Sequence, residues 1–326
     1  MIPMKINSEI INELRIVLAS AKKIAIVSHI SPDGDNVGSV LAMSRALMAN
    51  CVAEIDIIKT DLIPENLMFL PGINLYKETI SKEIYDIVIV LDCGDLDRLG
   101  DSKKIADQTK YLINIDHHKT NTLYGDLNIL NPKASSTGEI VYTLLKELDY
   151  NIDIDCATCI YTAMSTDTGS FKYSNTSSYT HFIVSELMDI GIDISNINVE
   201  LYQNRELSKT QLFIKSVSML EFFKNNKIAV AHVNSEMLNE TKSLMGDSDG
   251  IVEFIRDIKN VEVACLIKIY ENDNLIKCSF RSKNDVDVSE FCENHNGGGH
   301  QRAAGCTFNT LEKSEVIKCI LNEIDI

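Results

Sequence analysis

The segment 24–39, IAIVSHISPDGDNVGS, decides how the rest of the chain is interpreted. It opens on an apolar, β-branched run, passes His29 and a turn-forming Pro-Asp-Gly-Asp sequence, and enters a helical pattern near Gly38. A strand, a tight loop and a helix in this order begin a βαβ unit, in which ligands sit beyond the carboxyl end of the strand. His29, Asp33 and Asp35 are therefore placed where a ligand would bind.

One imidazole and two carboxylates in so short a stretch suit metal coordination. A polar turn, in which Asp and Gly serve turn geometry alone, explains this loop equally well when the loop is taken by itself. The number of similar loops further along the chain decides between the two interpretations.

Length and composition restrict the class of protein. The chain has 326 residues, of which 45% are hydrophobic and 24% charged, and this fits a globular protein of two domains. Residues 1–22 are typical of a surface helix and not of a secretion signal, and no run of about 18 apolar residues predicts a membrane span. Nine scattered cysteines predict reduced thiols and a cytoplasmic location. The lone Cys156-X-X-Cys159 pair is interpreted as two core cysteines, with a redox or zinc site as the alternative.

The formal net charge of −16 restricts the class of partner. Proteins that bind long nucleic acids usually carry a basic track, so this charge argues against a processive nuclease. A short anionic substrate that is held by metal ions and a few local arginines remains compatible with it.

The order of elements predicts an α/β fold with a doubly wound, mostly parallel sheet over residues 1–190. In this part, helical patterns alternate with apolar runs at 24–28, 53–58, 87–91 and 111–115. Residues 191–214 are interpreted as a linker. Residues 215–326 form a second, smaller α/β domain of antiparallel character, with strand patterns at 228–233, 261–270 and 275–281.

Acidic clusters recur at the ends of the apolar runs. After HISPDGD come DCGDLDR at 92–98 and DHH at 116–118, and TDTGSF at 166–171 follows a helical pattern. Crowded carboxylates repel one another, and two divalent cations would balance them. Mixed imidazole and carboxylate ligands favour manganese over magnesium. The metal-ligand candidates are His29, Asp33, Asp35, Asp92, His117 and Asp167.

The ordered motifs HISPDGD, DCGDLDR, DHH, STDTG and, far downstream, GGGHQRAAG resemble the DHH phosphoesterase family. Within it, the chain is similar to the members with a DHH-associated C-terminal domain, which are exonucleases for short oligonucleotides (nanoRNases) that also dephosphorylate 3′-phosphoadenosine 5′-phosphate. The resemblance implies a catalytic, metal-binding domain at 1–190 and a substrate-binding domain at 215–326.

The resemblance also implies a role for each site residue. One metal ion would be held by His29, Asp33 and Asp92, and the other by Asp35, Asp92, His117 and Asp167. Asp92 would bridge the two ions and, with Asp116 and His118, form the catalytic set. His118 would face the substrate phosphate. Asp116 would orient a histidine, with an acid of an N-terminal helical turn as the alternative.

The segment Asn296–Gly305, NGGGHQRAAG, is the distinctive feature of the second domain. Glycine allows backbone N–H groups to approach an anion closely, so we interpret the segment as a nucleotide cradle, with a flexible turn as the alternative. The family often has another glycine or a bulky residue where this chain has His295-Asn296, and this difference is expected to alter base or sugar contacts. The predicted substrate-binding residues of this domain are Arg281, Gly297, Gly298, Gly299 and His300.

Arg98 has two interpretations, because it lies six residues after Asp92. It supports the substrate phosphate, or it pairs with the nearby acids Asp95 and Asp97.

Three other functions remain alternatives. A family II inorganic pyrophosphatase would share the metal ligands but would have no use for a nucleotide cradle. A RecJ-like single-strand exonuclease is opposed by the acidic charge. A non-catalytic metal- or nucleotide-sensing module is opposed by the complete ligand set. The expected partners are two Mn²⁺ ions and a short oligonucleotide or nucleotide, with no long nucleic acid and no membrane. The protein partner that is compatible with the sequence is a second copy of the chain, in a homodimer.

Overall fold

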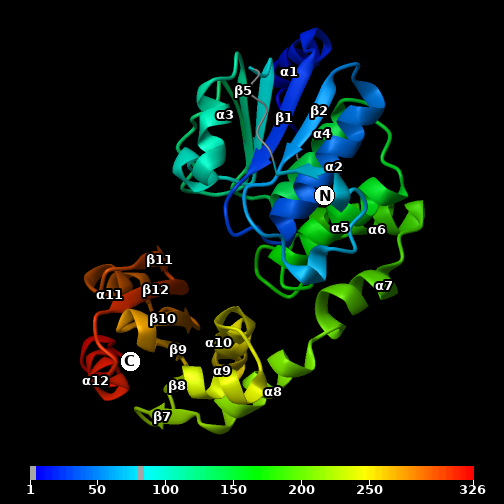
Figure 1. Ribbon diagram of the computed structural model, residues 1–326. Helices are drawn as coiled ribbons and strands as arrows, with labels where there is room; N and C mark the ends of the chain where they lie inside the picture. The colour runs from blue at the N-terminus through cyan, green and yellow to red at the C-terminus, as the bar shows by residue number, and fades with distance from the viewer. Residues whose placement is uncertain (1–4, 79–83) are drawn as a thin grey trace. The chain divides into compact units, whose positions relative to one another are not determined.

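The computed structural model describes residues 5–78 and 84–326. The chain divides into two compact units, Met1–Asn204 and Arg205–Ile326, each with its own sheet (Figure 1). None of the helices in the described part of the chain is long and apolar enough to cross a membrane.

The N-terminal unit is built on a six-stranded parallel sheet, as the alternating pattern predicted. The strands lie in the order β3-β2-β1-β4-β5-β6, so the winding of the chain reverses between β1 and β4. In open sheets of this kind, ligands bind beyond the carboxyl ends of the strands at that reversal. The strands are β1 (Lys23–Ser28), β2 (Glu54–Ile58), β3 (Tyr76–Lys77), β4 (Ile87–Leu91), β5 (Leu112–Asp116) and β6 (Leu127–Leu130).

Both faces of this sheet are covered, which explains why its strands are continuous apolar runs. Ile24 and Ile26 of β1 pack under the larger group of helices, and Ala25 and Val27 face the smaller one. The larger group contains α1 (Ser8–Ser20), α2 (Gly34–Asn50), α4 (Thr137–Glu147), α5 (Ile154–Asp167) and α6 (Ser178–Ile190). The smaller group contains the 3-10 helix η3 (Leu96–Ser102) and α3 (Lys103–Asp107). Figure 1 shows α2, α4 and α5 on one side of the sheet and α3 on the other.

Helix α2 begins at Gly34, so the predicted start near Gly38 was wrong. Asp33 is the N-cap and its side chain accepts the Asn36 N–H, which allows the helix to start directly after the turn. The glycines lie inside the helix because α5 packs very closely on it. A Cβ atom would lie 2.4 Å from Thr166 at Gly34 and 2.5 Å from a backbone carbonyl at Gly38.

The connection predicted at 191–214 is largely helical. It contains α7 (Ile194–Asn198), the π-helix η4 (Val199–Gln203) and most of α8 (Leu207–Ser218). The division between the two units falls inside it, after Asn204.

The C-terminal unit has a second six-stranded sheet in the order β11-β12-β10-β9-β8-β7. Its pairs are antiparallel except for β8 and β9, which are parallel. The strands are β7 (Glu221–Phe223), β8 (Ile228–Val233), β9 (Val263–Tyr270), β10 (Leu275–Ser282), β11 (Gly298–His300) and β12 (Ala303–Phe308). Strands β3, β6, β7, β11 and β12 were not predicted, because their short runs lack a distinct apolar pattern.

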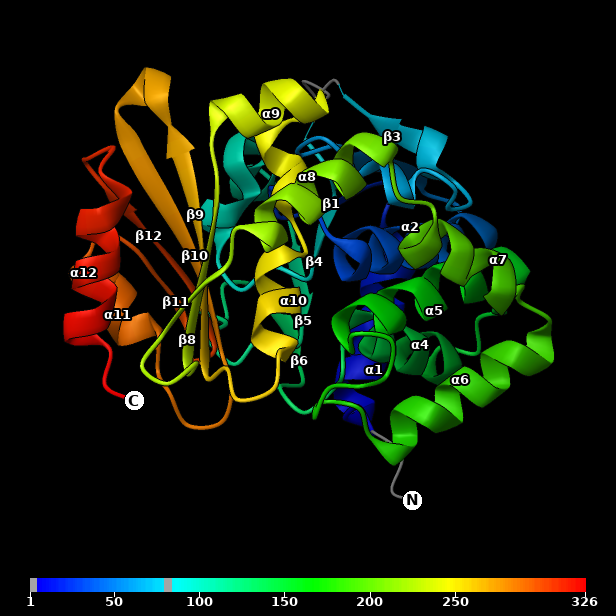
Figure 2. The ribbon, with the colours of Figure 1, turned by 90° about the horizontal axis from the view of Figure 1, so that it is seen from below.

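Helices cover both faces of the second sheet as well. Figure 2 shows α11 (Ser289–Asn294) and α12 (Lys313–Glu323) on one face. The other face is covered by α8, α9 (Ser235–Thr241) and α10 (Ile251–Asp257). Short 3-10 turns complete the two units at Glu65–Leu67, Ile73–Leu75, Met245–Ser248 and Glu271–Asp273.

Candidate metal centre

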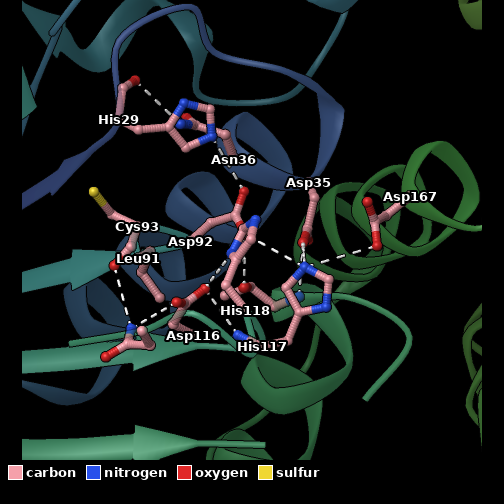
Figure 3. A network of polar contacts seen from close by, with 12 residues as sticks. His29, Asp35, Asn36, Leu91, Asp92, Cys93, Asp116, His117, His118 and Asp167 are labelled. Atoms are coloured by element: carbon pink, nitrogen blue, oxygen red, sulfur yellow. Dashed lines mark hydrogen bonds and ion pairs between the residues drawn. The ribbon is translucent and has the colours of Figure 1, made fainter. Parts of the chain in front are cut away.

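The candidate ligands of the N-terminal unit converge at the carboxyl ends of its central strands (Figure 3). His29 follows β1, Asp92 follows β4, and Asp116 ends β5 with His117 and His118 directly after it. Parallel strands end at the same edge of a sheet, and for this reason residues far apart in sequence meet here. The cluster lies at the reversal between β1 and β4.

Asp92 occupies the centre of the cluster. Its Oδ2 lies 3.4 Å from His29 Nε2, whereas its Oδ1 lies 3.7 Å from His117 Nε2. The two oxygens of one buried carboxylate thus face two different histidines. Asp92 has a left-handed φ of 55°, a conformation that is rare outside glycine and is concentrated at functional sites.

The first ligand group consists of His29, Asp33 and Asp92, whose ligand atoms lie within 4.8 Å of one another. The Nδ1 of His29 is 2.7 Å from the Ile30 carbonyl oxygen. A carbonyl can only accept a hydrogen bond, so Nδ1 carries the hydrogen and Nε2 presents its lone pair toward Asp92. Metal-binding histidines are commonly oriented in this way.

The second ligand group consists of Asp35, His117 and Asp167. His117 Nε2 lies 3.7 Å from Asp35 Oδ2, and it has the same distance to one oxygen of Asp92 and one of Asp167. Ligand atoms that surround a shared ion at about 2.0–2.2 Å lie roughly 3–4 Å from one another. The spacing is therefore that of a coordination shell, and Asp92 borders both groups.

Thr137 and Gly138, at the N-terminus of α4, hold the central carboxylates. Their backbone N–H groups donate to Asp35 over 2.7 and 2.9 Å, and the Thr137 hydroxyl donates to Asp92 Oδ1 over 3.0 Å. The sequence analysis identified neither residue, because neither belongs to the recurring acidic clusters. The available signal was Ser136, whose side chain caps the helix by accepting the Glu139 N–H.

Burial sets the protonation of these ligands. It raises the pKa of Asp35 to about 7 and the pKa of Asp92 well above the ordinary range. It also raises the pKa of Asp167 and lowers the pKa of His29. The protein alone therefore does not stabilise this concentration of negative charge, whereas divalent cations would. The donor set fits two such ions.

The repulsion and burial of these carboxylates predict that the stability of the metal-free protein depends on pH. Asp35 titrates at about 7 when folded and near 3.8 when unfolded, so the folded state binds more protons in between. Through Asp35 alone, stability should then fall as pH rises, by about 2–3 kcal/mol between about pH 5 and pH 8, whereas the lowered pKa of His29 acts in the opposite direction. Melting curves with and without manganese measure this loss, which saturating metal should largely remove.

The Asp35→Asn variant is the control for this measurement, because its side chain does not titrate. Its metal-free stability should depend less on pH than that of the unaltered protein. An Asp35→Asn variant whose metal-free stability depends on pH in the same way as that of the unaltered protein would contradict the assignment.

Asp116 orients His118. Its Oδ1 lies 2.7 Å from His118 Nδ1 and accepts the His117 N–H, and its Oδ2 accepts from Asn121. Burial acts to raise the pKa of Asp116, but the hydrogen bonds and charge of His118, together with Asn121, lower it overall. The hydrogen bond to Asp116 raises the pKa of His118. Asp116 ends a strand, so the alternative of a helical N-terminal acid was wrong.

Arg98 lies beside the metal cluster. Its Nη2 is 3.4 Å from His29 Nδ1. The neighbouring acids have other roles, because Asp95 caps η3 and Asp97 pairs with Lys103. The role of Arg98 at the substrate phosphate stays a prediction.

The remaining predicted residues belong to the C-terminal unit. The Arg281 guanidinium lies 3.0 Å from Glu253 of α10. Gly298, Gly299 and His300 form strand β11, and a turn at Gln301-Arg302 leads directly into β12. Close packing on β12 requires two of the glycines: a Cβ atom would lie 2.0 Å from the Gly305 oxygen at Gly297 and 2.6 Å from the Ala303 oxygen at Gly299.

His295 packs within its own unit, and the effect of the His295-Asn296 difference on base or sugar contacts stays a prediction. Its ring centroid lies 4.6 Å from that of Phe291 and 4.8 Å from that of Phe308, and its Nε2 lies 2.8 Å from Glu323. These contacts turn it toward the core of its own unit.

The cysteines are free thiols, and most of them are buried. In α5, Cys156 donates to the Ala42 carbonyl and Cys159 to the Pro71 carbonyl. The interpretation of this pair as core cysteines is confirmed.

Comparison with known proteins agrees with this geometry. Residues 23–164 match the DHH family, N-terminal domain, and residues 225–325 match the DHHA1 domain. Two proteins named bifunctional oligoribonuclease and PAP phosphatase NrnA are similar over most of their length. The one from Thermus thermophilus is 29% identical over 92% of this chain and 89% of its own. The one from Bacillus subtilis is 26% identical over 89% and 90%.

A solved structure has the same fold throughout. It is an exopolyphosphatase-related protein from Bacteroides fragilis, 29% identical, with a TM-score of 0.91 over 98% of this chain and 96% of the other. With both domains matched in order and the ligand groups in place, the chain belongs to the DHH family of phosphoesterases and consists of a DHH domain followed by a DHHA1 domain.

Proposed function

We propose that this phosphoesterase is manganese-dependent, hydrolyses short oligonucleotides such as linear dinucleotides to mononucleotides, and also dephosphorylates 3′-phosphoadenosine 5′-phosphate. The observation that carries the proposal is the pair of neighbouring ligand groups, of which Asp92 belongs to the first and lies 3.7 Å from His117 of the second. The names of the relatives from Thermus thermophilus and Bacillus subtilis support the substrate class. The free thiols support a cytoplasmic location.

In this proposal, His29 and Asp33 would hold one divalent ion, and Asp35, His117 and Asp167 would hold the other, with Asp92 as a ligand available to either. Two such ions supply Lewis-acid stabilisation of a phosphoryl group. Thr137 fixes the orientation of Asp92 by donating to one of its oxygens. His118, held by Asp116 and with a raised pKa, is placed to donate a proton or a hydrogen bond to the substrate.

A panel of substrates tests the proposal. The purified protein with manganese is offered ribo- and deoxyribo-oligonucleotides of two to ten residues, 3′-phosphoadenosine 5′-phosphate, pyrophosphate and polyphosphate. The proposal expects the highest kcat/KM on the shortest oligonucleotides. A preference for pyrophosphate or polyphosphate would show that the substrate is not a nucleotide. A preference for the longest oligonucleotides would favour a RecJ-like exonuclease.

We further propose that the DHHA1 domain binds the distal part of the substrate through Arg281 and the segment Gly297–His300. The main support is chemical: guanidinium groups bind phosphate bidentately, and His300 at the end of β11 and Arg302 just after it are exposed. Arg281→Ala should lower kcat/KM on a dinucleotide about ten- to hundredfold, because a hydrogen bond to a charged group contributes roughly 1.5–3 kcal/mol. Hydrolysis of a small aryl phosphodiester should hardly change.

Glu253→Gln is the matched control, since it removes the acidic partner of Arg281 and keeps the arginine. If Arg281 serves only to pair with Glu253 in the fold, both variants should show the same loss. Equal losses of Arg281→Ala on the two substrates would place Arg281 at the scissile phosphate or in the fold, and no loss on either would place the binding residues elsewhere.

A further inference from the structure

The residues that follow Asp167 form an unusual turn. Gly169, Ser170 and Phe171 adopt left-handed φ values of 57°, 60° and 63° in succession. Thr168 holds the turn, because its hydroxyl accepts the Phe171 N–H over 3.0 Å and its carbonyl accepts the Tyr173 N–H over 3.0 Å. Left-handed residues other than glycine are costly and cluster at functional sites.

The turn seats the ring of Tyr173 on Gly169. A Cβ atom at Gly169 would lie 2.3–2.6 Å from three carbon atoms of that ring. The left-handed φ alone does not explain the glycine, since Ser170 and Phe171 adopt the same conformation with side chains. Gly169 is needed because the aromatic ring rests directly on its backbone.

The ring of Tyr173 is nevertheless accessible, with 46% of the residue exposed. Close by, Tyr202 is 41% exposed, and its hydroxyl lies 2.9 Å from that of Ser165 in α5. Burial raises the pKa of Tyr202, and the hydroxyls of Tyr161 and Tyr173 are near enough to raise it further. Two accessible aromatic side chains thus border the C-terminal end of the helix that carries Asp167.

The turn is also tied to the metal centre. The Asn175 side-chain amide donates to the Asp167 backbone carbonyl over 3.1 Å, to the Asp167 carboxylate over 3.4 Å and to the Ser135 carbonyl over 2.9 Å. The position of the Tyr173 ring is therefore coupled to that of a candidate metal ligand. An aromatic ring that is fixed by contact with the backbone on one face is preorganised. Little entropy is therefore lost when a second ring stacks on its other face.

We infer that the exposed face of Tyr173 is a stacking platform for the nucleobase of the nucleotide whose phosphate lies at the metal centre. The inference rests on the proposed function, because it requires a nucleotide substrate. Every nucleobase offers a π-face, so such a platform binds nucleotides without reading their sequence. It also favours nucleotides over pyrophosphate and polyphosphate, which have no ring to stack.

Kinetics separate stacking from structural support. Tyr173→Leu should raise KM for a dinucleotide roughly ten- to hundredfold, with little change in kcat, and Tyr173→Phe should remain close to the unaltered enzyme. An abasic dinucleotide, which keeps both sugars and the phosphate, should be hydrolysed equally by all three. Equal losses of Tyr173→Leu on both substrates would instead mean that the ring only supports Asp167, and no loss would overturn the platform.

The chain has no tryptophan, and this permits a direct measurement of binding. In the manganese-loaded Tyr173→Trp variant, adenosine 5′-monophosphate should quench the single indole, whereas ribose 5-phosphate should not. Phe182→Trp, at a 40% exposed position of α6, is the matched control and should respond to neither. The platform is overturned if adenosine 5′-monophosphate causes no quenching at concentrations that inhibit dinucleotide hydrolysis.

The outcomes also distinguish this inference from the proposed function. If the unaltered enzyme hydrolyses no nucleotide, the proposed function fails and the platform fails with it. If the enzyme hydrolyses dinucleotides and Tyr173→Leu has no effect on them, only the platform fails.

Discussion

Asp92→Asn should lower kcat on a dinucleotide by several orders of magnitude while the protein stays folded. The fold should survive because the amide has the same shape: its oxygen can still accept from Thr137, and its NH₂ group can donate to His29 Nε2. The negative charge and one of the two ligand oxygens are lost. Since Asp92 borders both ligand groups, the variant should also bind less than two manganese ions per chain, as measured by metal analysis after dialysis.

Asp97→Asn is the matched control for this experiment. It makes the same chemical change on the loop that follows β4, at an exposed carboxylate that pairs with Lys103. Its turnover should be close to that of the unaltered enzyme. Near-normal turnover of Asp92→Asn with two manganese ions bound would rule out the bridging role.

Removal of divalent metal should abolish turnover, and this is the second large effect that we expect. The buried carboxylates need cationic counter-charge, and the ligand groups combine histidine with aspartate. Such a mixed donor set suits manganese better than magnesium, which prefers oxygen ligands and retains its water. Chelated enzyme that is reloaded to saturation should therefore turn over a dinucleotide much faster with manganese than with magnesium.

Binding measurements make this result interpretable. Calorimetric titration of each ion into the chelated protein establishes saturation before the rates are compared. The titration should also release protons near neutral pH, because the metal-free Asp35 has a pKa of about 7. Equal recovery with the two ions at saturation would mean that the histidines are not ligands.

The sequence by itself determined the position of most of the metal centre. Apolar runs that end in HISPDGD, DCGDLDR and DHH identify parallel strands, and the carboxyl ends of such strands meet at one edge. His29, Asp92 and His117 could therefore be grouped without coordinates. Two local properties of the sequence suffice for this grouping. They are the β-branched composition of the runs and the acidic residues that follow them directly.

Only the tertiary structure decided how these groups are oriented. Thr137 reaches Asp92 and Asp35 from a helix that begins some 45 and 102 residues further along the chain, so these hydrogen bonds join segments that are distant in sequence. The start of α2 also depends on a distant contact. Glycine usually disfavours a helix, but Gly34 is required in α2 because Thr166 of α5 leaves no room for a side chain there.

The glycine-rich segment shows the same limit in the C-terminal unit. Its composition indicates flexibility, yet Gly298–His300 is a strand, because Gly297 and Gly299 allow β12 to approach more closely than any side chain would permit. In each case the conformation depends on contacts between segments that are distant in sequence or packed against another element. Local residue preferences contain no information on such contacts, and the folded chain alone determines them.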